Sequence, residues 1–176
     1  MTANMSPIKD FVGRSLVSGT SASVLSTIAL ACGGHFDCRN TLAPVNAVSH
    51  WVWGDRAIHA NGPAWRYTAV GYVIHHAMSV FWAAFYEAWV GRSPQRQRPA
   101  AAILAGLAVA AAACVVDLRL TPKRLTPGFE RRLSPWSLAL VYVAFGLALP
   151  LVTLCRPRQG QDARAIPAAT PSAGTN

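Results

Sequence analysis

The sequence has few charged residues and very few acidic ones. Only 13% of the 176 residues are charged, and just seven are Asp or Glu, whereas about 25% of a typical soluble domain is charged. At the same time, 52% of the residues are hydrophobic. A soluble domain would lack polar surface at this composition, so the apolar excess predicts a protein embedded in a lipid bilayer.

The sequence also lacks the motifs of the common membrane enzymes. It contains no CxxC pair, no glycine-rich phosphate loop, no carboxylate-rich prenyl-diphosphate motif and no recognisable activated nucleophile. We therefore assign no catalytic residue. The sequence favours a structural or accessory membrane protein over an enzyme.

Cysteine is scarce as well, and the four cysteines do not form a disulfide framework. Only Cys32 and Cys38 lie close together near a predicted aqueous face. They would pair if that face were in an oxidising compartment, and two free thiols are an equally good expectation. The residues leading to Cys32 resemble a signal peptide, but hydroxyl side chains make this stretch weakly hydrophobic, so we expect an uncleaved first span.

Apolar residues are concentrated in four blocks, each close to the 20 or so residues that a membrane-spanning helix needs. The predicted spans are residues 11–31, 69–90, 99–116 and 135–154. They predict an all-α, polytopic membrane domain over residues 11–155, after an N-terminal tail of residues 1–10. Residues 156–176 have no apolar periodicity and are predicted to form a disordered C-terminal tail.

Small residues recur at helical spacing in two of the spans, a pattern that lets helices approach closely. In the first span they are Ser15, Ser18, Ala22, Ser26, Ala29 and Gly33. In the third span they are Ala101, Ala105, Ala108 and Ala112. Each set of small residues predicts a helix face that packs against another helix. The face on the third span would also suit contact with a second copy of the chain or with another membrane protein.

The net charge of +9 comes from basic residues that flank the spans. This position favours contact with anionic lipid headgroups and argues against nucleic acid as a partner. Four spans place eight basic residues on each side of the membrane, so the positive-inside rule gives a tie. We predict cytoplasmic termini because the longest loop has the fewest basic residues for its length.

That longest loop lies between the first two spans. Pro44 is placed to begin a short helix and Gly54 to end it. This helix is predicted to be interfacial or re-entrant, with Trp51 and Trp53 as its anchors at the headgroup level. Its candidate polar residues are Asn46, His50, Asp55 and His59. We interpret them as ordinary hydrogen-bonding residues, with a metal site at the two histidines and Asp55 as the alternative.

The third loop contains three related tetrapeptides, RLTP from Arg119, RLTP from Arg124 and RLSP from Arg132. Each proline restricts the residue before it to extended conformations. The loop's basic residues are predicted to bind lipid headgroups: Arg119, Lys123, Arg124, Arg131 and Arg132. Ser134 is expected to cap the fourth span, with Pro135 at its first position.

The second span carries a polar stripe within an otherwise apolar run, GYVIHHAMSVFWAAFYEAWV from residue 71 to 90. The stripe consists of Tyr72, His75, His76, Ser79, Tyr86 and Glu87. Residues eleven apart on a helix differ by about 20° in direction, so His76 aligns with Glu87. The stripe should face protein, because unpaired polar groups in lipid are costly.

Three interpretations of the stripe compete. In the favoured one, the histidines hydrogen-bond to another helix of the same chain and hold the bundle together. In the second, His75 or His76 binds haem or a metal ion in a membrane redox component. In the third, His76 and Glu87, with Asp117 as a further candidate, form a proton relay or substrate site in a small transporter or membrane enzyme. No cofactor is predicted under the favoured interpretation.

Three segments carry a family resemblance: NAVSHWVWGDRA (46–57), GYVIHHAMSVFWAAFYE (71–87) and RLTPKRLTPGFERRLS (119–134). Together they resemble a family of uncharacterised small bacterial inner-membrane proteins with four helices, and more distantly the YagU-type membrane proteins. The resemblance implies a location in the bacterial inner membrane. It implies no activity, cofactor or catalytic residue.

Overall fold

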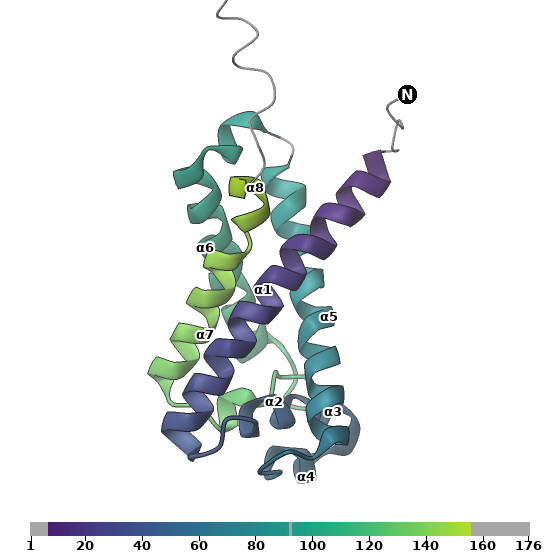
Figure 1. Ribbon diagram of the computed structural model, residues 1–176, viewed down its shortest axis with the longest axis vertical. Helices are drawn as coiled ribbons and strands as arrows, with labels where there is room; N and C mark the ends of the chain where they lie inside the picture. The colour runs from purple at the N-terminus through teal and green to yellow at the C-terminus, as the bar shows by residue number, and fades with distance from the viewer. Residues whose placement is uncertain (1–6, 92, 156–176) are drawn as a thin grey trace, which may run out of the picture.

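The computed structural model describes residues 7–91 and 93–155, and the regular elements within these ranges are all helical. Four long helices form an antiparallel bundle: α1 (Pro7–Cys38), α5 (Trp65–Val90), α6 (Pro99–Val115) and α7 (Pro135–Ala148) (Figure 1). The predicted all-α class is confirmed. The predicted tail over residues 156–176 and the first six residues of the N-terminal tail lie outside the described residues.

Within the described residues, three helical stretches are long and apolar enough to cross a membrane: Pro7–Cys38, Pro99–Leu120 and Pro135–Cys155. Large apolar side chains cover their outward faces, among them Ile28, Leu104 and Leu140. Such a contiguous apolar exterior suits lipid and would be a liability in water. The structure therefore supports a multi-pass membrane protein.

The helices extend beyond several of the predicted spans. The first helix begins at Pro7 and ends at Cys38, and the second begins four residues before the predicted start. The last span is divided, because the helix stops near Pro150 and resumes as α8 (Leu151–Cys155). Proline lacks the N–H that a continuing helix requires, which accounts for the division.

Helix α1 crosses the middle of the bundle and packs on α5 and α7 (Figure 1). Its predicted small-residue face is buried along its whole length, from Ser15 to Gly33. On this face, a Cβ added to Gly19 would lie only 2.5 Å from the Cα of Val80. The small residues thus allow α1 and α5 to approach at backbone distance, as predicted.

The predicted small-residue face of α6 is not the face that packs inside the bundle. Of its four alanines only Ala105 is buried, and Ala112 is exposed. The buried face is formed instead by Ala102, Ala105, Gly106, Val109, Ala110 and Ala113. The closest approach is at Gly106, where an added Cβ would overlap the carbonyl of Gly146 on α7. Glycine permits this contact, and the contact sets the rotation of α6.

The long loop folds into three short helices at one end of the bundle, α2 (Ala43–Val48), α3 (His50–Trp53) and α4 (Asp55–Ile58) (Figure 1). Pro44 lies in the first turn of α2, and Gly54 ends α3 with a φ of 65°. All six residues of α2 are buried against the rest of the protein, so this short helix does not present an apolar side to lipid. Gly71 lets α5 contact the backbone of α2 directly at the Val45 carbonyl.

The third loop is compact and also lies at this end of the bundle. It begins with a π-helical turn, η2 (Val116–Leu120), and includes a short helix, η3 (Phe129–Arg131). Ser134 caps α7 as predicted by accepting a hydrogen bond from the Ser137 amide at 3.3 Å. Asp37, near the end of α1, accepts a bond from the Ser134 amide at 2.7 Å.

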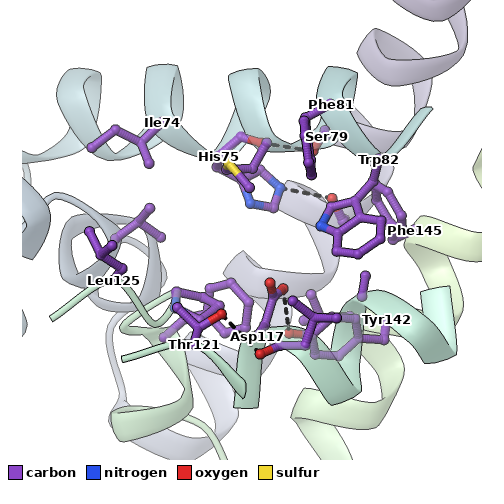
Figure 2. A pocket seen from close by; sticks show the side chains of 18 of the residues that line it. Ile74, His75, Ser79, Phe81, Trp82, Asp117, Thr121, Leu125, Tyr142 and Phe145 are labelled. Carbon is purple, nitrogen blue, oxygen red and sulfur yellow. Dashed lines mark hydrogen bonds between the residues drawn. The ribbon is translucent and has the colours of Figure 1, made fainter. Parts of the chain in front are cut away.

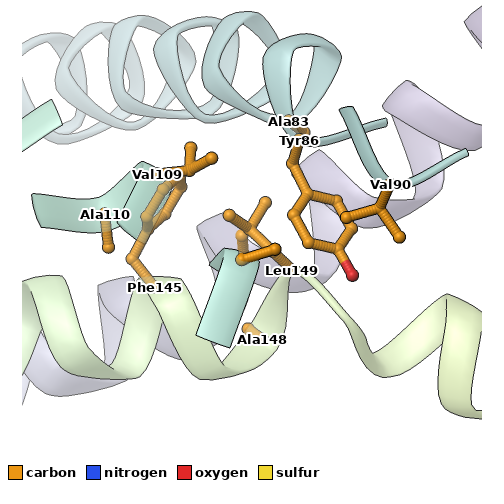
Figure 3. Packing of buried hydrophobic residues seen from close by; sticks show 10 residues of the cluster. Ala83, Tyr86, Val90, Val109, Ala110, Phe145, Ala148 and Leu149 are labelled. Atoms are coloured by element: carbon orange, nitrogen blue, oxygen red, sulfur yellow. The ribbon is translucent and has the colours of Figure 1, made fainter. Parts of the chain in front are cut away.

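Two apolar clusters hold the bundle together. One joins α5, α6 and α7 through Tyr86, Val90, Val109, Phe145 and Leu149 (Figure 3). The other lies nearer the loops and includes Leu30, Val45, Val48, Phe129 and Leu133. The space between the helices at this second cluster is not completely filled, and the residues that border it form the candidate site.

Candidate functional site

Glu87, the one acidic member of the polar stripe, is paired with α1. The residue is only 2% exposed. Arg14 donates to Oε2 from Nε at 2.7 Å, and Ser18 donates to Oε1 at 2.5 Å. The buried carboxylate is thus neutralised and hydrogen-bonded within the chain.

His75 also bonds to α1. Its Nε2 lies 2.8 Å from Oγ of Ser26, which itself lies 2.7 Å from the carbonyl of Ala22. The Ser26 hydroxyl has one proton, and a carbonyl can only accept, so Ser26 donates to Ala22 and His75 donates to Ser26. This arrangement places the ring proton on Nε2 and leaves Nδ1 as an acceptor.

The remaining members of the stripe have different surroundings. Tyr86 is fully buried in the apolar cluster, and its hydroxyl has no hydrogen-bond partner among the described residues. His76 stacks on Tyr72 with ring centroids 6.0 Å apart. Ser79 is buried and donates to the His75 carbonyl at 2.8 Å. The members of the stripe therefore have three kinds of surroundings. Glu87 and His75 contact α1, Tyr72, His76 and Ser79 contact their own helix, and Tyr86 lies in the apolar core.

A cavity of about 260 Å³ lies between α1, α5, α6 and α7 and is bordered toward the loop end by α3 and the third loop. It is partly open, because its lining includes the half-exposed side chains of Phe81 and Leu125. Most of its lining is apolar, with five aromatic side chains besides tyrosine and histidine: Trp51, Phe81, Trp82, Phe129 and Phe145. The polar lining residues are Ser26, His75, Ser79, Asp117, Thr121 and Tyr142. A mostly apolar pocket with few convergent polar groups is the usual form of a small-molecule site.

His75 and Asp117 face each other across this cavity (Figure 2). Asp117 lies on the π-helical turn η2 and accepts a hydrogen bond from the Tyr142 hydroxyl at 3.0 Å. Such turns are frequent at functional sites because they redirect a side chain out of the regular helical pattern. The sequence predicted Asp117 only as a further candidate beside His76 and Glu87. It gave no signal that Asp117 would lie opposite His75, because the two residues are on different helices.

The cavity offers both acceptors and a donor to a ligand. Nδ1 of His75 faces the space toward Asp117 (Figure 2). The indole Nε1 of Trp82, a buried donor, has no partner within the part of the chain that the structure describes. Two acceptors and one unused donor therefore border an otherwise apolar space.

Neither His76 nor Glu87 lines the cavity. Glu87 is closed off by Arg14 and Ser18, and the His76 ring lies beside Tyr72 on the same helix. The geometry does not support a proton relay through these two residues. For the haem or metal hypothesis, the candidate ligand is His75, because its ring lines the cavity and the ring of His76 does not.

The loop candidates are separated by the fold. Asn46 is fully buried and holds the loop together, donating to the carbonyls of Ala60 at 3.1 Å and Gly62 at 3.0 Å. His50 is buried, whereas Asp55 and His59 are exposed. Over residues 7–91 and 93–155, no three His, Cys, Asp or Glu side chains converge as a metal site.

The predicted headgroup-binding residues do not form one group. Arg119 is exposed on the π-helical turn. Arg132 is partly buried and bonds to the Ile58 carbonyl at 3.3 Å and to Asn61 at 2.6 Å, so it joins the two loops. Lys123, Arg124 and Arg131 share a second hollow beside α3.

These observations define a class: a multi-pass helical membrane protein with a largely apolar, partly open cavity between its helices. No protein-family model, curated protein or solved structure matches the chain. What the cavity does must therefore be argued from its own residues.

Proposed function

We propose that this chain is a four-span protein of the bacterial inner membrane with an accessory, non-catalytic role. In this proposal it binds a small amphiphile in the cavity between His75 and Asp117. The observation that carries the proposal is the placement of these two hydrogen-bonding side chains on opposite walls of an apolar space. The resemblance of the three sequence segments supports the location in the bacterial inner membrane.

The proposed fourth span is α5. Its 26 residues correspond to about 39 Å of helix, which exceeds the thickness of the bilayer core. Its polar stripe lowers its hydropathy, but Glu87 and His75 are paired with α1. Pairing inside the bundle offsets the cost of placing these groups at membrane depth.

The lining indicates the chemistry of the ligand. Nδ1 of His75 and the Asp117 carboxylate both accept hydrogen bonds, so the ligand must carry a donor. A hydroxyl group also accepts, which would satisfy the unpartnered Trp82 indole. The aromatic walls suit an apolar body. We therefore expect a hydroxyl-bearing amphiphile, such as a phenol or an alicyclic alcohol.

A pair of matched probes tests this proposal. The aromatic bodies of 2-naphthol and naphthalene are the same, but only 2-naphthol carries a hydroxyl. Their binding to the purified protein in mild detergent is measured by equilibrium dialysis against protein-free micelles. We expect 2-naphthol to bind at least about tenfold more tightly, because a hydrogen bond to a charged group contributes about 1.5–3 kcal/mol.

Variants locate the binding. Asp117→Asn and His75→Gln are expected to remove most of the preference for 2-naphthol and to leave naphthalene binding nearly unchanged. His76→Gln is the matched control, because the adjacent histidine does not line the cavity. Equal binding of the two probes, or equal losses in the His75 and His76 variants, would contradict the proposal.

We also propose that both termini lie on the cytoplasmic side. The support is the long first loop, which is rich in tryptophan and low in basic residues for its length. An Arg56→Cys variant in a cysteine-free background provides the test, since Arg56 is exposed on α4. We expect a membrane-impermeant maleimide to label this cysteine in intact cells. Labelling only after lysis would show the opposite orientation.

A further inference from the structure

A second hollow, of about 340 Å³, lies where α3 and α4 meet the third loop. It is lined by His50, Trp51, Val52, Gly54, Asp55, Lys123, Arg124 and Arg131. It shares only Trp51 with the lining of the His75–Asp117 cavity. A ligand here would therefore be independent of the amphiphile proposed above.

The charge of this hollow is positive. Lys123, Arg124 and Arg131 are basic, and Asp55 is the one acidic lining residue, which leaves two positive charges in excess. Arg131 lies 3.4 Å from Asp55, whose side chain is 85% exposed. An exposed ion pair at this distance is weak, so an anion in the hollow can replace Asp55 as the partner of Arg131.

His50 adds a fixed polar group to the wall. It is only 6% exposed, and its Nδ1 donates to the Ala47 carbonyl at 2.9 Å. Gly128, at a φ of 87°, passes so close that an added Cβ would lie 2.6 Å from this nitrogen. The ring is thus held in place, while its Nε2 has no hydrogen-bond partner in the described ranges.

The hollow lies at the end of the bundle where aromatic side chains project outward. Trp65 begins α5, Trp136 lies in the first turn of α7, and Phe36 lies near the end of α1; they are 82%, 86% and 78% exposed. These helix ends and the short helices α2 to α4 lie together (Figure 1). Exposed tryptophan marks the headgroup level of a membrane protein.

We infer that this hollow binds the phosphate group of an anionic lipid headgroup. Lys123, Arg124 and Arg131 supply the charge for the phosphate. Because His50 donates from Nδ1, its unpartnered Nε2 is an acceptor, and it would bond to a headgroup hydroxyl and not to the phosphate itself. Asp55 opposes the anion and weakens its binding. The depth set by the aromatic residues points to a lipid as the source of the phosphate.

The test measures lipid retention by the full-length protein. Protein purified in mild detergent is mixed with equal amounts of phosphatidylglycerol and phosphatidylcholine, and retained lipid is counted by native mass spectrometry. We expect phosphatidylglycerol to be enriched. In the Lys123→Gln/Arg124→Gln/Arg131→Gln variant the enrichment should fall at least about tenfold, since one basic group near anionic lipid contributes about fivefold.

Two single variants separate this site from general charge effects. Arg56→Gln removes a positive charge from the neighbouring helix α4 without touching the hollow and should leave retention unchanged. Asp55→Asn should raise retention, a gain that misfolding cannot produce. No enrichment in the unmodified protein, or equal losses in the triple and Arg56 variants, would overturn the inference.

Inorganic phosphate distinguishes the source of the anion. If added phosphate does not displace phosphatidylglycerol, the lipid assignment stands. If it displaces the lipid from the unmodified protein but binds no better than background to the triple variant, the site recognises free phosphate and the lipid assignment is overturned.

Discussion

The carboxylate of Glu87 on α5 and the guanidinium of Arg14 on α1 form a buried ion pair. Nη2 of Arg14 lies 2.7 Å from Oε2 of Glu87, and the two side chains are 14% and 1% exposed. Seventy-three residues separate them in the sequence. The pair connects the first two long helices and gives the most polar member of the stripe a partner.

Removing one member of this pair should destabilise the bundle strongly. Glu87→Gln leaves Arg14 with an uncompensated buried charge, and we expect a loss of about 3 kcal/mol in unfolding free energy. The double variant Arg14→Gln/Glu87→Gln should recover much of this loss, because two amides can bond without net charge. Denaturation in mixed detergent micelles measures both.

The control is Arg56→Gln, which removes an exposed arginine on α4. It should change the unfolding free energy by less than about 0.5 kcal/mol. The ion pair would be unimportant if Glu87→Gln changed the unfolding free energy as little as this control does. The same conclusion would follow if the double variant lost as much unfolding free energy as Arg14→Gln and Glu87→Gln lose together.

Gly71 should not tolerate a side chain. An added Cβ would overlap the carbonyl of Val45, so Gly71→Ala must separate α5 from α2. Gly13→Ala on α1 is the matched control, because no atom lies within 4 Å of its added Cβ. We expect Gly71→Ala to lower the thermal midpoint and Gly13→Ala to raise it slightly, since alanine is the better helix former by about 0.5–1 kcal/mol. Equal midpoints for the two variants would contradict this contact.

Asn46 should control the order of the loop between α4 and α5. Besides its two bonds to loop carbonyls, it accepts a bond from Thr68 at 2.6 Å. Asn46→Ala leaves those carbonyls and the Thr68 hydroxyl without this partner, at a cost of about 1–3 kcal/mol for each buried group left unsatisfied. Faster hydrogen exchange over residues 59–64 is the expected result. Thr68→Val removes one bond only and should have a smaller effect.

Cys32 and Cys38 should remain free thiols. Both are unpaired in the structure, and Cys38 donates from Sγ to the Arg132 carbonyl at 2.8 Å. Six residues on a helix span about 9 Å, whereas a disulfide needs Cα atoms within about 7 Å. Maleimide labelling should therefore count four thiols even after copper–phenanthroline oxidation. A loss of exactly two thiols, abolished by Cys38→Ser, would show that this end of α1 unwinds.

The membrane class was readable from sequence because it depends on local composition. The length and hydropathy of a membrane span can be read from the residues of that span alone, without knowing what packs against it. Among the described residues, three helices meet both conditions. Local stereochemistry was equally readable at Ser134, which caps α7, and at Gly54, which ends α3. The small-residue face of α1 was predicted correctly because its spacing extends over many turns.

The rotation of α6 within the bundle was not readable from the sequence. Alanine occupies most of its positions, so composition could not show which face packs against the other helices. Close contact at Gly106 with α7 decides this. Likewise, the burial of α2 was not readable from its own residues, and the contact of Gly71 with Val45 shows it.

By itself, the sequence determined that the chain is helical, membrane-embedded and polar along one stripe of its second long helix. Only the tertiary structure decided the partners of that stripe: Arg14 and Ser18 for Glu87, and Ser26 for His75. It also placed Asp117 opposite His75 across a cavity. Helical periodicity fixes which residues of one helix share a face, whereas the face that they meet depends on how four helices pack together.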